Sequence, residues 1–227
     1  TRWGRSAWKN RILKQIRPMT DYLRNPEEIY RKSFAIVREE TDLSRVSTEI
    51  AEIVTRLVHA CGMPEIASDI AYSDGLVSAG RKALADGKSI VTDVRMLDAG
   101  IIRHRLPASN PVLCAIGDEG LAEEAKSRNT TRSAVAIEKL SDAWTGGIVA
   151  IGSAPTALFR VLEMINDGAP PPAVILGFPV GFVGAADSKE ALIEADNGVP
   201  FITLRGRRGG SALAAAAVNA LAGPLEG

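Results

Sequence analysis

The chain has 227 residues, of which 46% are hydrophobic and 24% are charged, and its 27 basic residues balance 27 acidic residues. This length allows one domain or at most two small ones, and the composition excludes disordered, collagen-like and disulfide-stabilised proteins. Because no apolar run approaches the roughly 20 residues that span a bilayer, an integral membrane protein is also excluded.

The charge is unevenly distributed along the chain. Residues 1–18 contain six basic residues and no acidic residue, which leaves 21 basic against 27 acidic residues in the remainder. A nucleic-acid-binding module usually carries basic charge over its folded body, so this distribution argues against a nucleic-acid partner. We expect residues 1–20 to form a flexible basic extension and residues 21–227 to form a single domain.

The two cysteines, Cys61 and Cys114, lie in unrelated contexts, without CxxC or Cys/His spacing. Such spacing would indicate a metal site or a redox motif. We therefore expect two free core thiols, no bound metal and a reducing compartment, which indicates a cytoplasmic protein.

Two helices are expected first in chain order. Asn25, followed by a proline and by Glu28, is typical of a helix start, and this helix should run to about Glu40. A second helix is expected from near Ser47 to Gly62, which is a typical residue for ending a helix. Its apolar residues recur at helical spacing on one face: Ile50, Ile53, Val54, Leu57, Val58 and Cys61.

From residue 89 onward, short apolar runs alternate with helical stretches. The predicted strands are 89–92, 112–116, 148–151, 173–176 and 201–204. The clearest predicted helices are 132–142, 156–167, 188–196 and 211–221, with Asp187 and Glu190 as a capping pair for the third. Because the runs are apolar on both faces, they indicate buried parallel strands. We predict an α/β fold with an open, mainly parallel sheet flanked by helices and with an N-terminal helical segment.

Each predicted strand ends in residues that bend the backbone or bind ligands, and ligands of open α/β sheets bind at this carboxyl edge. Arginines are frequent there: Arg95, Arg132, Arg205, Arg207 and Arg208. Arginine binds carboxylates and phosphates in a bidentate manner, although a solvated basic turn explains the same residues. Since the glycine-rich fingerprints of nucleotide-binding loops are absent, a polycarboxylate fits better than a nucleotide.

His59 lies opposite the apolar face of the second predicted helix, so it should face water, a partner or a ligand. It also lies in the last turn, where the helix dipole favours a cation and raises the pKa. These features suit a general acid, but the residues alone favour a histidine that only caps the carbonyls at the helix end. His104, between two arginines, is expected at the surface.

Six segments together are similar to a known family: 30–34 (YRKSF), 57–62 (LVHACG), 92–96 (TDVRM), 154–158 (APTAL), 177–182 (GFPVGF) and 205–210 (RGRRGG). In this order they resemble the precorrin-8X methylmutases, the precorrin isomerases of cobalamin biosynthesis. The resemblance extends from about Asp21 to Ala222 and excludes the basic extension. One departure is Ser153, where the family pattern has asparagine, so a contact at that turn is in doubt.

The resemblance implies an isomerase without a cofactor. Such enzymes move a methyl group from C11 to C12 of the corrin precursor in a 1,5-sigmatropic shift, which gives hydrogenobyrinic acid. It implies that His59 is the catalytic residue and protonates a ring nitrogen, and that the enzyme is a homodimer with the site near the subunit interface. The substrate-binding residues that it implies are Ser33, Arg31, Thr92, Asp93, Arg95, Arg132, Gly177, Pro179, Arg205, Arg207 and Arg208.

Two other functions stay open on the sequence. One is a carrier that binds a tetrapyrrole without turnover, and an inert His59→Ala variant would support it. The other is an α/β enzyme for a nucleotide or sugar phosphate. Added phosphate would raise the thermal stability of such an enzyme. Within the resembling family the substrate is either metal-free or contains cobalt, and no residue distinguishes the two.

Overall fold

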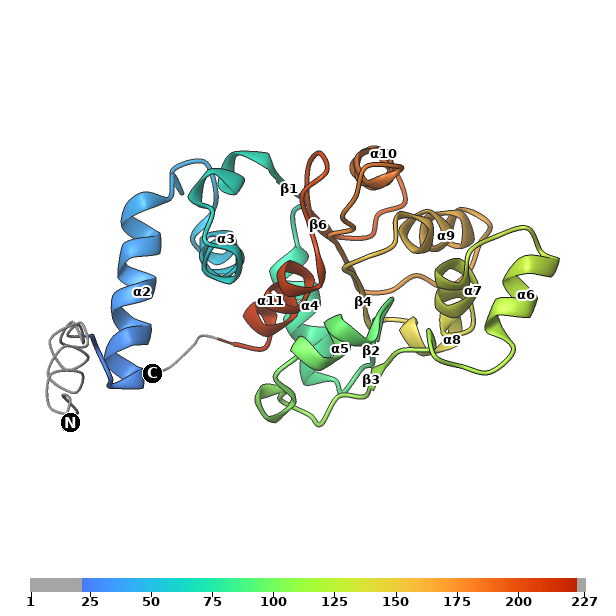
Figure 1. Ribbon diagram of the computed structural model, residues 1–227, viewed down its shortest axis with the longest axis horizontal. Coiled ribbons are helices and arrows are strands. Elements are labelled where there is room, and N and C mark those ends of the chain that lie inside the picture. Colours follow the sequence, from blue (N-terminus) through green and yellow to red (C-terminus); the bar gives the residue numbers. More distant parts are fainter. Residues whose placement is uncertain (1–21, 224–227) are drawn as a thin grey trace, which may run out of the picture.

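The computed structural model describes residues 22–223, so the predicted basic extension, residues 1–20, lies outside the described residues. Its centre is a six-stranded sheet (Figure 1). The strands are β1 (Ile70–Tyr72), β2 (Ile90–Thr92), β3 (Val112–Leu113), β4 (Ile148–Ile151), β5 (Val174–Gly177) and β6 (Phe201–Leu204). They are arranged in the order β1-β6-β5-β4-β2-β3, and all neighbours are parallel except β1, which pairs antiparallel with β6 at the edge. The predicted open, mainly parallel sheet is confirmed.

Helices cover both faces of the sheet. One face carries α3 (Thr48–Cys61), α4 (Leu76–Ala85), α5 (Arg95–Gly100) and α11 (Ser211–Leu221). The other carries α7 (Arg132–Glu138), α8 (Ser141–Trp144), α9 (Pro155–Asn166) and α10 (Ala185–Glu194). Along β4, Ile148 and Ala150 belong to the first core, whereas Val149 and Ile151 belong to the second. This division explains why the strand is apolar at every position.

Four shorter or outer elements complete the fold. The N-terminal helix α2 (Pro26–Glu40) packs on α3 at the outer side of the molecule (Figure 1). The 3-10 helix η1 (Pro64–Asp69) joins α3 to β1, η2 (Arg103–Arg105) precedes β3, and α6 (Leu121–Ser127) packs against α7. Within residues 22–223, no helix is both long and apolar enough to cross a membrane.

The two predicted N-terminal helices are confirmed with their ends. Asn25 accepts a hydrogen bond at its side-chain oxygen from the backbone N–H of Glu28 at 3.1 Å, and α2 ends at Glu40 as expected. The side chain of Ser47 caps α3, and Gly62 ends it in the left-handed conformation with φ of 69°. Both local sequence signals therefore act as their chemistry predicts.

Three details of the sequence prediction are wrong. The helix expected over 132–142 is interrupted after Glu138, so that α8 can place the fully buried Trp144 in the second core. The strand expected over 112–116 ends at Leu113. The capping pair expected at Asp187 and Glu190 does not exist, because α10 begins earlier, after a glycine, and both residues lie inside it.

Gly152, at the carboxyl end of β4, allows α11 to approach the sheet. A Cβ atom at this position would lie 2.7 Å from the Cα of Ser211 and 3.0 Å from Cδ1 of Leu97. We expect Gly152→Ala to lower the free energy of unfolding by about 1–3 kcal/mol, because the clash forces the helix away. Chemical denaturation would measure it.

Ser153→Ala is the matched control, since no hydrogen bond of that hydroxyl occurs within the described residues and its loss should change stability by less than about 0.5 kcal/mol. Equal stability of the Gly152→Ala and parent proteins would contradict the close approach.

Candidate functional site

A crevice is expected where β2 and β4 lie side by side, because the chain leaves these two strands toward opposite edges of the sheet. In this structure the side chain of Asp93 occupies the position of that crevice. Its carboxylate accepts hydrogen bonds from the backbone N–H groups of Gly152, Ser153 and Ala154 at 2.9, 2.8 and 2.8 Å, and the residue is 1% exposed. The structure therefore places Asp93, which the sequence suggested as a substrate contact, in the support of the β4–α9 turn.

Thr92, Gly177 and Pro179 also lie inside the fold. The Thr92 hydroxyl donates to the carbonyl of Leu113 at 3.2 Å. Gly177 accepts from the buried Thr203 hydroxyl at 2.5 Å, and Pro179 is buried. Burial raises the pKa of Asp93, although the N–H groups that it binds oppose the shift. None of these four predicted contact residues presents an uncommitted polar side chain within residues 22–223.

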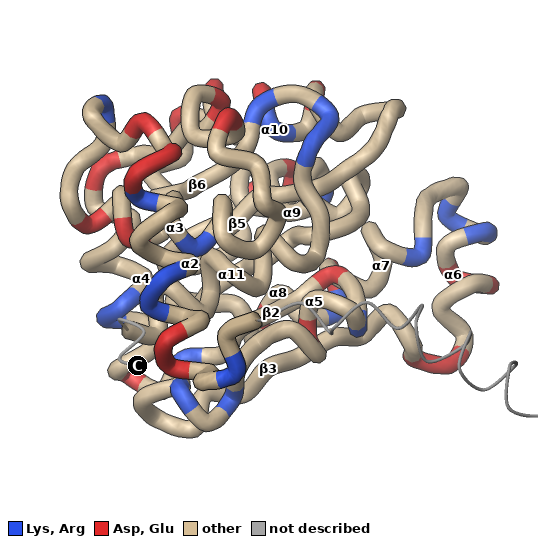
Figure 2. The backbone as a smooth tube through the Cα atoms, turned by 60° about the vertical axis from the view of Figure 1, so that its left-hand side comes forward, with Lys and Arg blue, Asp and Glu red and all other residues tan. Residues whose placement is uncertain are grey.

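The three arginines after β6 have different surroundings. Arg205 forms an ion pair with Glu190 of α10, and Arg208 pairs with Asp69 at 2.5 Å and with Glu65 at 3.3 Å, both in η1. Arg207 has no carboxylate partner in the described part of the chain; its guanidinium carbon lies 5.3 Å from the centre of an exposed phenylalanine ring, that of Phe182. Figure 2 shows the basic residues, in blue, on the loop beside α10.

The other predicted arginines are exposed. Arg31 lies on α2, Arg95 at the first position of α5 and Arg132 at the first position of α7. Within residues 22–223 none of the three has a carboxylate partner. Together with Arg207 they remain available for an anionic ligand, whereas Arg205 and Arg208 are already committed to acidic residues of the fold.

His59 is held against α2. Its Nδ1 lies 3.1 Å from the Ser33 hydroxyl, its ring stacks on Phe34 at a centroid distance of 4.5 Å, and Tyr30 approaches edge-on at 5.8 Å. The structure thus brings together the predicted residues His59 and Ser33. Tyr30 and Phe34 were not predicted as site residues, although their i, i+4 spacing around Ser33 places all three on one helix face.

The expected rise in the pKa of His59 is wrong. Burial lowers the pKa of this imidazole, and the positive charge of Arg56, one turn earlier on α3, lowers it further. Arg56 is only 7% exposed, so its charge is weakly screened. These two effects outweigh the attraction of the helix C-terminus for a cation.

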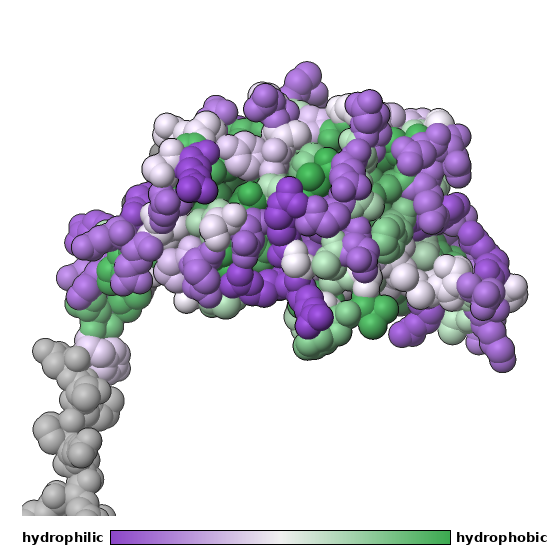
Figure 3. All heavy atoms as spheres, turned by 90° about the horizontal axis from the view of Figure 1, so that it is seen from above, coloured by the Kyte–Doolittle hydropathy of each residue, from purple (hydrophilic) through white to green (hydrophobic). Residues whose placement is uncertain are grey.

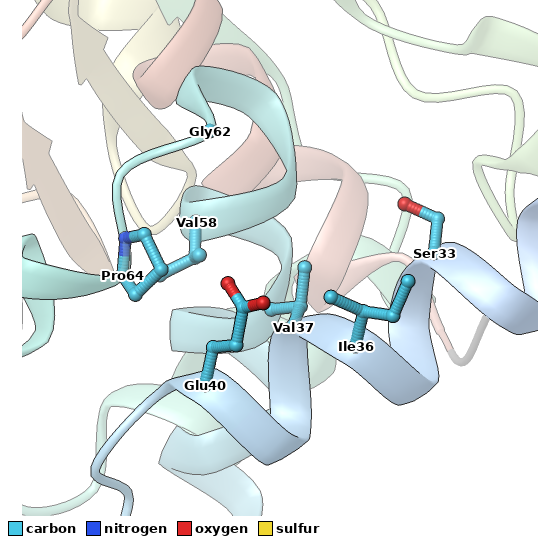
Figure 4. Close-up of a pocket in the computed structure, with 7 residues that line it drawn as sticks. All are labelled: Ser33, Ile36, Val37, Glu40, Val58, Gly62 and Pro64. Carbon is cyan, nitrogen blue, oxygen red and sulfur yellow. The ribbon is translucent and has the colours of Figure 1, made fainter.

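A cavity of about 360 Å³ opens beside His59. It is lined by Tyr30 and Phe34 from α2, by Arg56 and His59 from α3, and by small residues of α11 such as Ala212. Ser33 borders a second cavity of about 190 Å³, where Ile36, Val37 and Glu40 of α2 face the end of α3 (Figure 4). The bonded pair of Ser33 and His59 therefore stands between two hollows.

The His59 cavity and the arginine loop belong to one edge of the molecule. The helix α3 ends just after His59 and continues into η1, whose Asp69 and Glu65 bind Arg208. On the other side, α11 begins directly after the loop and lines the cavity with Ala212. An anion bound at this loop would therefore lie beside the His59 cavity.

The other candidate groups are possible metal ligands and the cysteines. In the described part of the chain, no group of three or more His, Cys, Asp or Glu side chains could hold a metal ion. Cys61 and Cys114 are both free and half-buried. His104 is exposed, as the sequence predicts.

Known proteins are similar to this chain in sequence and in fold. The sequence model of the family described as precorrin-8X methylmutase (CbiC) matches residues 28–223. Precorrin-8X methylmutase of Pseudomonas aeruginosa is 51% identical over 208 residues, which cover 92% of this chain and 100% of that protein. Cobalt-precorrin-8 methylmutase of Priestia megaterium is 38% identical over 208 residues, covering 91% and 90%. The crystal structure of precorrin-8X methylmutase from Thermus thermophilus superposes with a TM-score of 0.78 at 37% identity, covering 86% and 94%.

Arg56 can be tested as the charge that depresses the pKa of His59. We expect Arg56→Gln to raise the pKa of His59 toward its ordinary value, because the nearest positive charge is removed. Titration of the imidazole signals by NMR would measure the change, with the His104→Gln protein to assign the two histidines.

Arg81→Gln removes an exposed positive charge from α4 and should leave the pKa of His59 unchanged from that in the parent protein. If the Arg56 and Arg81 variants gave the same midpoint as the parent, burial alone would account for the depressed pKa.

Proposed function

The chain belongs to the precorrin-8X methylmutase family and has its isomerase activity in cobalamin biosynthesis, and we propose that His59 is the general acid of that reaction. One observation carries the proposal: His59, held by Ser33, lines a cavity at the same edge as Arg207, which has no acidic partner within residues 22–223. The comparisons do not favour a carrier without turnover.

The hydrogen bond between Ser33 and His59 suggests how the proton is held. In the imidazolium form, Nδ1–H donates to the Ser33 hydroxyl and Nε2–H is left for the substrate, so that loss of the Nε2 proton leaves a neutral imidazole. Transfer to a ring nitrogen of the macrocycle would draw electrons toward that nitrogen while the methyl group leaves C11 and bonds to C12. The proton returns afterwards, so the reaction is a balanced isomerisation.

General acid catalysis of this kind contributes about 10²–10⁴-fold. The remaining acceleration has to come from holding the macrocycle in a reactive conformation. We assign this holding to the aromatic wall of Tyr30 and Phe34 and to the exposed arginines, namely Arg31, Arg95, Arg132 and Arg207, which would bind the peripheral carboxylates.

We further propose that the substrate is the metal-free precorrin-8X and the product hydrogenobyrinic acid. The relative named precorrin-8X methylmutase is 51% identical, whereas the relative named cobalt-precorrin-8 methylmutase is 38% identical. No cofactor is needed for the proposed proton transfer. The free, half-buried cysteines support a reducing, cytoplasmic location. The match of the family model to residues 28–223 supports a single domain over residues 21–227, with residues 1–20 as an extension outside it.

A homodimer is proposed from two observations. A cavity of about 360 Å³ lies at the low end of the roughly 300–1,000 Å³ that enclose a drug-sized ligand, so a corrin precursor needs further walls. The outer helix also exposes apolar side chains: Ile29 and Ile36 lie seven residues apart and are 44% and 41% exposed, and Tyr22, just before the helix, is 55% exposed. Figure 3 shows hydrophobic atoms, in green, on this part of the molecule. A second copy packed on α2 would cover them and enlarge the site.

His59→Ala should lower kcat by about 10²–10⁴-fold, since the general acid is lost. Ser33→Ala should lower it less, by about tenfold, because the imidazole stays but loses one hydrogen bond. Absorbance time courses with precorrin-8X, and in parallel with its cobalt form, would measure conversion to hydrogenobyrinic acid.

His104→Ala is the matched histidine control and should convert substrate at the parent rate. Full activity of His59→Ala would contradict the assigned acid, binding without conversion by the parent protein would indicate a carrier, and faster conversion of the cobalt form would overturn the choice of substrate.

For the dimer, we expect Ile29→Glu to shift the protein toward a monomer, because a carboxylate would be buried between the two α2 helices. Analytical ultracentrifugation measures the mass. Ala35→Glu, on a different face of the same helix, should keep the dimer. A parent protein that sediments as a monomer would contradict the proposal.

A further inference from the structure

Lys189 is a fully buried charge on α10. Its exposed fraction is 0%, and burial lowers the pKa of the ammonium to about 8, with Glu190 opposing the shift. Its Nζ donates a hydrogen bond to the backbone carbonyl of Arg208 at 2.6 Å. Among the described residues, this carbonyl is the only acceptor of that ammonium. Lysine is almost never fully buried, because desolvating an ammonium is costly. A side chain of the same length without the charge would fill this space more easily.

The carbonyl that Lys189 binds lies in the loop between β6 and α11. This loop is also fixed at its other backbone groups: the N–H of Gly181 donates to the Arg207 carbonyl at 3.2 Å, and the N–H of Gly210 donates to the Phe178 carbonyl at 2.8 Å. Hydrogen bonds therefore fix the backbone carbonyls of two consecutive residues, Arg207 and Arg208. The backbone has little freedom to turn at this point.

Arg207 is the residue whose side chain depends on this support. The guanidinium of Arg208 is anchored by Asp69 and Glu65, whereas that of Arg207 meets only the Phe182 ring within residues 22–223. Phe182 is 85% exposed, so the pair presents a cation beside an apolar surface. A macrocycle with peripheral carboxylates offers the complementary features, namely negative charge for the cation and an apolar ring for the phenylalanine.

Binding is stronger when the receptor is already ordered, because less conformational entropy is lost on association. A loop with the composition Arg-Gly-Arg-Arg-Gly-Gly has few local restraints of its own, since glycine is the most flexible residue. A charge-assisted hydrogen bond from a buried, immobile lysine supplies such a restraint.

We propose that Lys189 is a positioning residue for substrate binding: its bond to the Arg208 carbonyl presents Arg207, with Phe182 beside it, to a substrate carboxylate. This inference rests on the proposed function, in which Arg207 binds the polycarboxylate. It assigns to α10 a part in substrate recognition although Lys189 itself never touches the ligand.

The test compares Lys189→Met with Lys189→Arg. Methionine keeps the length without the charge, so the melting temperature should stay the same or rise, while KM for precorrin-8X rises about five- to tenfold at nearly constant kcat. Arginine restores an N–H donor and should recover most of the parent KM. Lys126→Met, an exposed lysine on α6, controls for the loss of one charge and should keep the parent KM.

A double-mutant cycle with Arg207→Gln then separates positioning from general destabilisation. If Lys189 acts through Arg207, adding Lys189→Met to Arg207→Gln should raise KM by less than about twofold beyond the single variant. The same cycle can use Kd for hydrogenobyrinic acid, measured by absorbance titration.

Independent, multiplying effects of the two substitutions would overturn the inference, and so would a Lys189→Met protein that fails to fold while Lys189→Arg folds with a raised KM. These outcomes leave the methylmutase activity of the parent intact. A parent protein that neither binds nor converts the macrocycle would instead overturn the proposed function, and this inference with it.

Discussion

The contact between α3 and α11 is the constraint on which the site depends. The buried face of α3, which includes Ile53, Val54 and Leu57, packs against a helix in which most residues are alanine. Small side chains allow close approach of two helices, and they also leave the space that becomes the His59 cavity. Because α11 starts directly after the arginine loop, this contact brings the last turn of α3 to the carboxyl edge of the sheet.

The sequence predicted best those helices whose first residues are capped by a side chain. The helices α2 and α3 begin at Asn25 and Ser47, whose side chains cap them, and both were predicted with their ends. In contrast, α4, α6 and α10 begin after the left-handed glycines Gly75, Gly120 and Gly184 without a side-chain cap, so two were missed and the third was started too late. The strand β1 was not predicted, for another reason. Its three half-buried residues carry no periodic pattern, and only pairing with β6 makes them a strand.

The site was predictable to a similar extent. The position of His59 off the apolar face and the surrounding motif pointed to it, and the Ser33 contact agrees with that selection. The roles of the arginines could not be predicted, because their partners are distant in sequence: Arg208 meets Asp69 across 139 residues. Likewise, Asp93 has the appearance of a ligand contact until the turn 60 residues later is seen to occupy its carboxylate. Local sequence shows which groups are chemically able to bind, whereas the fold decides which of them are still free.

The depressed pKa of His59 is compatible with its proposed role as an acid once the charge of the ligand is considered. In the free protein, burial and the nearby Arg56 disfavour the imidazolium, so the ring is held mainly neutral at neutral pH. A polycarboxylate that enters the cavity brings negative charge to the same place, and an opposite charge within a few ångströms favours the protonated form. Arg56, the cation that helps to depress this pKa in the free protein, is therefore also a cation that can pair with the substrate. In this arrangement the acid is charged by the arrival of the molecule that it has to protonate, so the protonation state of the free protein does not measure that of the complex.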